Sequence, residues 1–572
     1  MTHDLTSQRA LLLTGGALLM LSVAWPHAAG AQDGNAGDFD ISSQIGPDPV
    51  LPEPDFVNLI PSMKVGEVIG WSEGQTPTVP DDLTITAYAT DLVNPRTVHT
   101  LPNGDVLVVQ SRAPKGKPKY RPKDYIRGWI MFFASGGGGG GPQKDSNLIT
   151  LLRDSDRDGV VDERHDLLTD LHSPFGLAWI DDTLYVAAAD AVLAYPYALG
   201  ENVITAEPET VTPLPGGPLN HHWTKDLALS PDGTMLYASV GSNSNAAENG
   251  MEAEKGRAAI WQIDRETGSS RIFASGLRNP NGLVFHPQTE QLWAVINERD
   301  ELGPNLVPDY MTSVQDGAFY GWPYSYYGDH VDERVRPARP DLVETAIAPD
   351  YALSSHVAAL GLVFTEGSAM PEPYANGAFV GQRGSWNRDT FNGYKVSYVP
   401  FTDGMPDGMA QDVVTGFLAG DEVHGRPVGL GIDGTGALLV ADDAGNTVWR
   451  VAPADGSVTD SPMGTDRVQA GEAPAEPAAA EEAAAPQPAA EDAAQAPTEP
   501  ATAPAAGEIP AAAPAPEDAP AAEAPVPDAA AAPEAEPVKE TEAEATDAEA
   551  DAAPAVPSTQ PLPPEETEAP AN

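Results

Sequence analysis

Basic and imidazole side chains recur at the beginning of apolar segments in a chain that is otherwise strongly acidic. The segment GLRNPNGLVFHP (276–287) places Arg278 and Asn279 directly before an apolar run. A buried strand requires neither side chain, so the pair is a candidate for binding or catalysis. Similar positions in other segments hold Arg96, His222, His424 and Arg426, and Arg383 stands next to a strand end in GQRGSWNR. Gathered in one cleft, such cations would attract a small anionic molecule, and an imidazole could act as a general base. Alternatively, each arginine pairs with a carboxylate of the fold.

Two adjacent histidines, His221 and His222, stand in the segment NHHWTKD. Successive side chains of an extended chain point to opposite faces, so we expect only one of them to face the cleft. The histidine that faces it would be the candidate base, and a structural hydrogen-bonding role is the alternative.

Acidic residues at alternating positions mark a second candidate site, in RDSDRDGVVDE (153–163). Loop positions 1, 3, 5 and 9 hold aspartates: Asp154, Asp156, Asp158 and Asp162. Together with Gly159 at position 6, they match the first part of a calcium-binding loop. Position 12 is His165 rather than glutamate, so the loop is incomplete as an EF-hand. The spacing favours a structural calcium site, and a solvated acidic turn is the alternative.

Six repeated units have to position these residues. Each unit has a short polar start, an apolar run, a tight turn and a second apolar run, and the units begin at Asn94, Ser173, Trp223, Asn279, Ala358 and Arg426. The turns PNGD, PDGT and DGTG supply the residues that hairpins need. Radial repetition of such units predicts an all-β fold, a six-bladed β-propeller with inserted loops. Loops on one face of a propeller converge on its axis. A β-solenoid is the alternative, with a shorter and more regular period.

The two ends of the chain differ from this middle region. Arg9, the apolar run LLLTGGALLMLSVAW and AGA before Gln32 predict a cleaved signal peptide over residues 1–31. We expect residues 32–81 to be an extension packed on the propeller, residues 82–455 to be the propeller, and residues 456–572 to be a disordered tail rich in Ala and Pro. From residue 468 onward that tail holds 23 acidic residues and one basic residue.

The formal net charge of −53 excludes nucleic acid as a partner, because binding phosphates requires clustered Lys and Arg. No membrane-spanning segment is expected after signal cleavage, and we expect the protein to be exported, to the periplasm or the medium. Cysteine is absent, so the fold has no disulfide and no thiolate ligand.

Three segments together resemble the glucose/sorbosone dehydrogenase family: GLRNPNGLVFHP, NERDELGPNLVPDYMTSVQDGAFYGWP (297–323) and RGSWNRDTFNGYKV (383–396). The similarity is greatest to the L-sorbosone dehydrogenase branch, which shares RPKDYI, NLITLLRDSDRDG and HHWTKDLALSPDG. It covers roughly residues 45–455. The family consists of soluble quinoproteins that use pyrroloquinoline quinone (PQQ) and calcium on a six-bladed propeller.

The resemblance implies a role for each matching residue. His222 corresponds to the general base that takes the substrate hydroxyl proton, and Arg278 to the arginine that contacts both quinone and substrate. Asn279, Arg383, His424 and Arg426 correspond to further cofactor-binding residues. The backbone carbonyls of Gly303 and Pro304 correspond to the calcium ligands. Two positions depart from the family pattern: His424 stands where an arginine is expected, and Ser242 where an acidic neighbour of the base is expected.

The expected function is oxidation of an aldose, a sorbosone-like sugar or a related hydroxy or aldehyde compound, with hydride transfer to PQQ and an external cytochrome or quinone as electron acceptor. A non-catalytic propeller that binds a carbohydrate or a protein is one alternative. A calcium-dependent, lactonase-like hydrolase is another, but its metal would require a ring of Glu, Asn and Asp side chains rather than basic residues.

Overall fold

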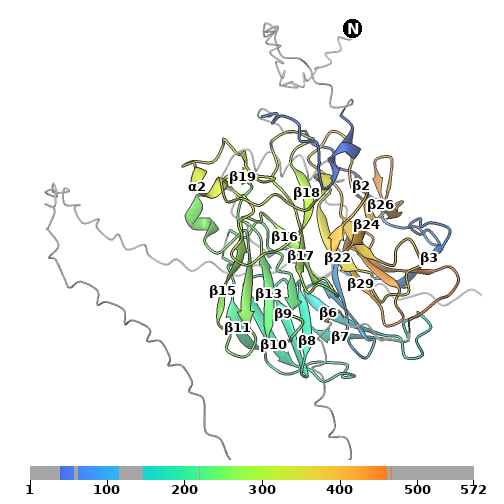
Figure 1. Ribbon diagram of the computed structural model, residues 1–572. Helices are drawn as coiled ribbons and strands as arrows, with labels where there is room; N and C mark the ends of the chain where they lie inside the picture. The colour runs from blue at the N-terminus through green and yellow to red at the C-terminus, as the bar shows by residue number, and fades with distance from the viewer. Residues whose placement is uncertain (1–38, 57–61, 115–145, 218, 460–464, 467–572) are drawn as a thin grey trace, which may run out of the picture. The chain divides into compact units, whose positions relative to one another are not determined.

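Short antiparallel strands make up nearly all the regular structure of the chain, seen in a computed structural model that describes residues 39–56, 62–114, 146–217, 219–459 and 465–466 (Figure 1). These residues lie in one compact unit, Met1–Ala480, of the two into which the chain divides. The predicted signal peptide and nearly all of the predicted tail lie outside the described residues. Helical segments in the described part are short: η2 (Ile41–Gln44), η3 (Met251–Glu254) and α2 (Pro340–Val343). None of the described helices is long and apolar enough to cross a membrane.

Six sheets of four or five strands follow one another along the described chain. The first contains β4 (Pro95–Thr100), β5 (Val106–Gln110), β6 (Leu148–Arg153) and β7 (Glu163–Leu168); the second contains β8 (Leu177–Ile180), β9 (Thr183–Ala187), β10 (Ala191–Pro196) and β11 (Glu209–Pro213); the third contains β12 (Leu227–Leu229), β13 (Met235–Val240), β14 (Ala259–Asp264) and β15 (Ser270–Ser275). The fourth contains β16 (Pro280–Phe285), β17 (Leu292–Ile296), β18 (Pro308–Ser313), β21 (Tyr351–Ser355) and β1 (Ile45–Gly46).

The fifth sheet contains β22 (Ala359–Phe364), β23 (Gly377–Gln382), β24 (Lys395–Thr402), β25 (Met405–Pro406) and β26 (Gln411–Val414). The sixth contains β29 (Pro427–Ile432), β30 (Leu438–Asp442), β31 (Thr447–Pro453) and β3 (Leu83–Ala89), so the first long strand of the chain completes the last sheet. Two smaller sheets are formed by β19 (Ser325–Tyr326) with β20 (His330–Val331), and by β2 (Glu67–Val68), β27 (Leu418–Ala419) and β28 (Glu422–Val423). The predicted all-β fold is confirmed.

Hydrophobic clusters join each sheet to the next. Leu107 and Leu184 belong to one cluster, between the first and second sheets. Corresponding clusters join the other successive pairs, and a last one places Val108 of the first sheet against Leu439 of the sixth. Because the second strand of a sheet is covered on both faces, its residues are buried without alternation, as in β5 and β17. The described sheets therefore form a closed ring.

Glycines allow the first strands of neighbouring sheets to approach one another. A Cβ atom on Gly176, Gly282, Gly361 or Gly429 would lie within 3.0 Å of an atom of the next first strand. Gly429, for example, faces the backbone of Arg96, and Gly361 faces that of Val428. This contact explains the GL dipeptide that recurs in the repeated units.

The described parts of the N-terminal segment lie on the ring. Strand β1 pairs with β21, and β2 pairs with β28. Trp71 donates a hydrogen bond from Nε1 to Asp442 Oδ2 at 2.7 Å. Contacts of the ring also extend beyond residue 455, because Thr459 N–H donates to the Thr435 carbonyl at 2.8 Å and Thr465 N–H to the Thr100 carbonyl at 2.7 Å.

Candidate functional site

A polar cavity of about 290 Å³ lies where loops at the beginnings of several first strands meet. Four of the predicted site residues line it: His222, Arg278, Asn279 and Arg383. The other lining residues that carry polar groups are Arg96, His221, Trp223, Thr224, Asn297, Glu298, Asp300, Asp309, His356, Trp386 and Asn387. The cavity thus contains imidazole, guanidinium and carboxylate groups within one small volume.

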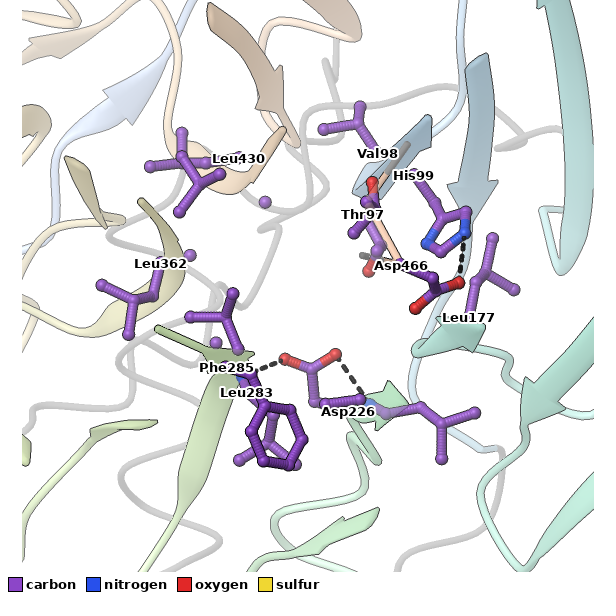
Figure 2. A pocket seen from close by; sticks show the side chains of 18 of the residues that line it. Thr97, Val98, His99, Leu177, Asp226, Leu283, Phe285, Leu362, Leu430 and Asp466 are labelled. Carbon is purple, nitrogen blue, oxygen red and sulfur yellow. Dashed lines mark hydrogen bonds and ion pairs between the residues drawn. The ribbon is translucent and has the colours of Figure 1, made fainter. Parts of the chain in front are cut away.

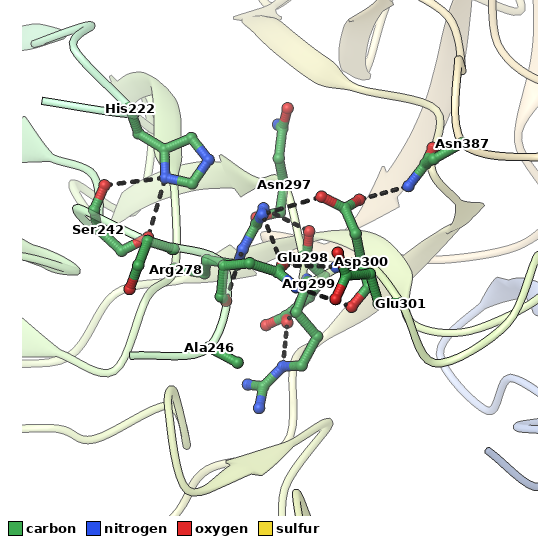
Figure 3. A network of polar contacts seen from close by, with 12 residues as sticks. His222, Ser242, Ala246, Arg278, Asn297, Glu298, Arg299, Asp300, Glu301 and Asn387 are labelled. Carbon is green, nitrogen blue, oxygen red and sulfur yellow. Dashed lines mark hydrogen bonds and ion pairs between the residues drawn. The ribbon is translucent and has the colours of Figure 1, made fainter. Parts of the chain in front are cut away.

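His222 is held through one ring nitrogen. Its Nδ1 lies 3.0 Å from the Ser242 carbonyl oxygen and 2.9 Å from Ser242 Oγ (Figure 3). The expectation that only one of the two adjacent histidines faces the cavity is wrong. His221 also lines it, with its ring stacked on that of His222 at 4.6 Å. Residues 221 and 222 form a bend rather than a strand, so the alternation of side chains does not apply to them.

Arg278 is buried, and its guanidinium is fixed by the chain itself (Figure 3). Nε donates to the Asn245 carbonyl at 3.2 Å, and Nη1 to the carbonyls of Asn297 and Glu298. Nη2 donates to Asn245 Oδ1 at 3.0 Å and to Asp300 Oδ2 at 3.3 Å. Its neighbour Asn279 is also buried, and Asn279 Oδ1 has no hydrogen-bond partner among the described residues.

Three arginines surround one buried carboxylate beside the cavity. Asp443 Oδ2 accepts from Arg96 Nη1 and, at 2.8 Å, from Arg383 Nε. Arg426 lies close by, with its guanidinium 5.4 Å from the ring centre of Tyr394. Burial and the positive charge of Arg383 lower the pKa of Arg426, and the Nε atoms of Arg96 and Arg426 have no hydrogen-bond partner within the described part of the chain. The arginine cluster (Arg96, Arg383, Arg426) therefore carries more positive charge than Asp443 offsets.

Sequence reasoning missed the cavity's acidic residues and its third histidine. Asp300 accepts a hydrogen bond from Asn387, and Asp309 accepts from the backbone N–H groups of Glu298 at 2.8 Å and Ala358 at 2.7 Å. Burial raises the pKa of Asp309 to about 7. His356 Nε2 lies 3.2 Å from the Gly303 carbonyl, and burial lowers the pKa of His356.

Sequence position could have indicated His356. It stands two residues before the fifth repeated unit, close to the position that His222 holds directly before the third unit. The acidic residues offered a weaker signal, since acids are abundant throughout the chain.

The structure does not bring Gly303 and Pro304 into the cavity. The Gly303 carbonyl faces the imidazole of His356, and the Pro304 carbonyl accepts from Arg388 Nη1 and, at 3.3 Å, from Ser355 Oγ. The Arg388 guanidinium opposes a metal ion at the Pro304 carbonyl only. The role of the two carbonyls as calcium ligands stays a prediction.

His424 also lies outside the cavity. Its ring stacks on Trp71 at 5.3 Å, and its Nδ1 lies 3.0 Å from the Gly70 carbonyl. The N-terminal segment thus covers the position where a cofactor ligand was expected. Arg426 does not line the cavity either, although it belongs to the arginine cluster behind Arg383.

The acidic loop between β6 and β7 brings three of its four aspartates together. Ligand oxygens of Asp154, Asp156 and Asp162 lie within 4.8 Å of one another, whereas Asp158 does not belong to this group. Asp158 Oδ1 instead accepts from Val160 N–H at 2.8 Å. Burial raises the pKa of Asp154 even though the loop's N–H groups donate to it. The chemistry of the donor set fits calcium.

A second cavity, of about 110 Å³, shares Arg96 with the lining of the polar cavity. Most of its lining is apolar (Figure 2). Its polar lining groups include Asp226 and the pair formed by His99 Nε2 and Asp466 Oδ2, which lie 3.1 Å apart. Burial raises the pKa of Asp226 to about 6. Since none of the predicted catalytic residues lines this cavity, the polar cavity is the candidate site.

The ring of sheets and its polar cavity define an all-β protein whose cavity is lined by guanidinium, imidazole and carboxylate groups. Comparison with known proteins then identifies the relatives. Residues 201–385 match the family model for glucose/sorbosone dehydrogenase, and residues 342–454 match the TrAA12-like model. The predicted resemblance to the glucose/sorbosone dehydrogenase family is confirmed.

Two curated relatives have low identity to the chain. An uncharacterized protein of Borreliella burgdorferi is 27% identical over 293 residues, which cover 49% of this chain and 76% of that protein. An aldose sugar dehydrogenase of Escherichia coli is 26% identical over 110 residues, which cover 19% of this chain and 28% of that protein.

Solved structures share the fold. The iodide structure of a Trichoderma reesei carbohydrate-active enzyme of family AA12 has a TM-score of 0.53 and 20% identity, covering 66% of this chain and 98% of that one. The holo form of the pyranose dehydrogenase PQQ domain from Coprinopsis cinerea has a TM-score of 0.53 and 19% identity, and the match covers 68% of this chain and 100% of that one.

Proposed function

We propose that the chain is an exported quinoprotein dehydrogenase on a six-bladed propeller. It would oxidise an aldose, a sorbosone-like sugar or a related hydroxy or aldehyde compound, and pass electrons to an external cytochrome or quinone. One observation supports the proposal above all. His222, Arg278 and Asn279 line one cavity, and the arginine cluster lies at and beside the same cavity. The match to the family model and the PQQ domain among the structural relatives support it.

The cavity residues fit PQQ, an anion with three carboxylates. The unpartnered Nε of Arg96 and the exposed part of Arg383 offer donors to carboxylate oxygens, and Asn279 adds a side-chain amide. When bound, PQQ supplies the acceptor for a hydride from the substrate carbon. His222 takes the proton of the substrate hydroxyl, and the fixed guanidinium of Arg278 stabilises negative charge on that oxygen.

Calcium is the second proposed cofactor, and one of the structural relatives is a calcium structure of the Trichoderma reesei enzyme. In this chain the aspartates of the 154–162 loop are the donor set that fits the ion. There the ion would stabilise the loop, since the loop lies between two strands and outside the cavity lining.

A lactonase-like reaction is less well supported, because each carboxylate that lines the cavity already has a partner on at least one oxygen. Glu298 pairs with Arg299 at 3.1 Å, Asp309 accepts two backbone N–H groups, and Asp300 pairs with Arg278. The only group of three close metal-ligating side chains within the described ranges is the acidic loop. A hydrolase would require a metal ring in the cavity itself.

The test is reconstitution of the full chain with PQQ and calcium, followed by PQQ titration and dye reduction with a panel of sugars. We expect His222→Ala to retain PQQ binding and to lose about 10²–10⁴ in kcat, the usual contribution of a general base. Arg383→Ala should weaken PQQ binding. The matched control is Arg271→Ala. Arg271 lies on the outer strand β15, and its exposed guanidinium pairs with Asp316.

Failure of PQQ to bind would overturn the proposal. PQQ binding without reduction by any sugar would favour the non-catalytic propeller instead.

A further inference from the structure

One loop, residues 242–245, connects the proposed base to the proposed substrate-binding arginine. Ser242 N–H donates to the Arg278 carbonyl at 2.7 Å, while Asn245 accepts from the Arg278 guanidinium through both its backbone carbonyl and its Oδ1. The carbonyl and hydroxyl oxygens of Ser242 both contact His222 Nδ1 (Figure 3). The orientation of both site residues therefore depends on this loop.

The hydrogen bonds of Ser242 determine which nitrogen of His222 carries the proton. Ser242 Oγ lies 2.6 Å from the Ser244 carbonyl oxygen, which can only accept, so the single hydroxyl hydrogen is directed there. Oγ consequently presents a lone pair to His222 Nδ1, and the Ser242 carbonyl also presents one. With two acceptors against it, Nδ1 must hold the hydrogen of the neutral ring, and the ring's basic lone pair lies on Nε2.

Glu254, the last residue of η3, holds this loop in place. It is 5% exposed, and its two carboxylate oxygens accept from Asn243 N–H at 2.6 Å and from the Ser244 hydroxyl. A buried carboxylate is costly unless it is hydrogen-bonded, and here both oxygens bind donors of the same loop. The carboxylate therefore fixes the position of the Ser244 carbonyl that orients the Ser242 hydroxyl.

We propose that Ser242 and Glu254 are positioning residues for the base: Glu254 fixes the loop, and Ser242 holds His222 in the tautomer whose Nε2 is basic. Ser242 thereby takes the place of the acidic neighbour that the family resemblance implies, without adding a second charge beside the ring. The inference rests on the proposed function of His222, but the tautomer can be measured in the protein without cofactor or substrate.

The decisive measurement is a long-range ¹H–¹⁵N correlation spectrum of the full chain labelled with ¹⁵N-histidine. The chain has 11 histidines, and the spectrum of His222→Gln assigns the signals of His222. We expect the wild-type protein to show a protonated Nδ1 and an unprotonated Nε2 in the neutral ring. The opposite tautomer in the wild-type protein would overturn the inference.

Variants test the two positioning residues. Ser242→Ala and Glu254→Ala should each shift His222 toward a mixture of tautomers, whereas Ser242→Thr, which keeps the hydroxyl, should preserve the wild-type spectrum. Ser239→Ala is the matched control, because this equally buried hydroxyl on β13 contacts Asp226 N–H rather than His222. If Glu254→Ala does not fold, Glu254→Gln retains the shape with one acceptor and should show a smaller shift. An unchanged tautomer in folded Ser242→Ala would contradict the role of the hydroxyl.

Kinetics of the reconstituted enzyme separate this inference from the proposed function. Ser242→Ala should lower kcat about 10–100-fold, as loss of a hydrogen-bond partner that orients a functional histidine commonly does, with KM and PQQ affinity nearly unchanged. A drop in PQQ affinity equal to the drop in kcat would indicate a general structural role instead. If no variant and no wild-type protein is active, the proposed function fails, and the spectrum alone decides the positioning role.

Discussion

Replacement of Asp443 by asparagine tests whether the arginine cluster is built for an anionic ligand. The substitution keeps the shape of the side chain and removes the carboxylate that pairs with Arg96 and Arg383. Breaking a buried ion pair by removing one partner typically costs about 3–5 kcal/mol. Unfolding entropy of about 2.1 cal/mol/K per residue over roughly 390 described residues converts this to a fall in Tm of about 4–6 °C.

Bound PQQ should reverse part of that loss, because its carboxylates would take over the pairing of the guanidinium groups. If bound PQQ restores about 1.4 kcal/mol of the stability lost in Asp443→Asn, the Kd of PQQ is about tenfold lower for the variant than for the wild-type protein. The PQQ-induced rise in Tm is then about 2 °C larger for the variant. The assay is thermal unfolding of the full chain with and without PQQ, together with calorimetric titration. A rise in Tm identical to the wild-type rise would show that PQQ does not contact the cluster and would refute the reasoning.

The matched control is Asp433→Asn. Asp433 is a similarly buried carboxylate that pairs with Arg450 at 2.6 Å, just beyond the other end of β29. Its loss should lower the Tm of the protein without PQQ and leave the PQQ-induced rise unchanged. An enlarged PQQ response in this control would mean that general destabilisation, and not the cluster, produces the effect.

Two further predictions concern ionisable groups. Burial raises the pKa of Asp309 to about 7, so its contribution to stability is complete below about pH 4 and is lost as the pH rises through 7. Between pH 5 and pH 8, the free energy of unfolding measured with urea should therefore fall by about 3 kcal/mol less in Asp309→Asn than in the wild-type protein. Parallel pH profiles of the two proteins would contradict the assignment. In the acidic loop, calcium at 100 times its Kd should raise stability by about 2.7 kcal/mol and Tm by about 3 °C. Asp162→Ala should abolish that rise and Asp158→Ala should keep it, and equal responses of the two variants would place the ion elsewhere.

The fold was predictable from sequence because its signals are local. Turn residues and apolar runs mark each repeated unit, and the GL dipeptides record where first strands touch. The convergence of His222, Arg278 and Asn279 on one cavity followed from their equivalent positions in successive units, whereas Arg383 follows the second strand of its unit, β23. Packing between units leaves no comparable signal. The N-terminal segment that covers His424 is such a contact, and no pattern near Trp71 indicates it.

Charge pairing was the harder part of the site to predict. An arginine in sequence does not reveal its partner, and Asp443 is one of many acidic residues, placed 60 positions from Arg383. The alternative that the arginines pair with carboxylates of the fold holds for Arg96, Arg278 and Arg383. Pairing does not exclude ligand binding, because the guanidinium groups of Arg96 and Arg383 share the one carboxylate of Asp443.

Arg278 shows how packing and chemistry coexist in a single residue. Four of its five hydrogen bonds go to backbone carbonyls and Asn245, which hold the guanidinium rigidly. The fifth, to Asp300 at 3.3 Å, is the longest and the only one to a charged group. A substrate oxygen that approaches the guanidinium must share or displace this contact, since every other donor is committed to a rigid partner. If Arg278 binds the substrate as proposed, its contact with Asp300 is the one that the substrate oxygen shares or displaces, and Asn387 also donates to Asp300.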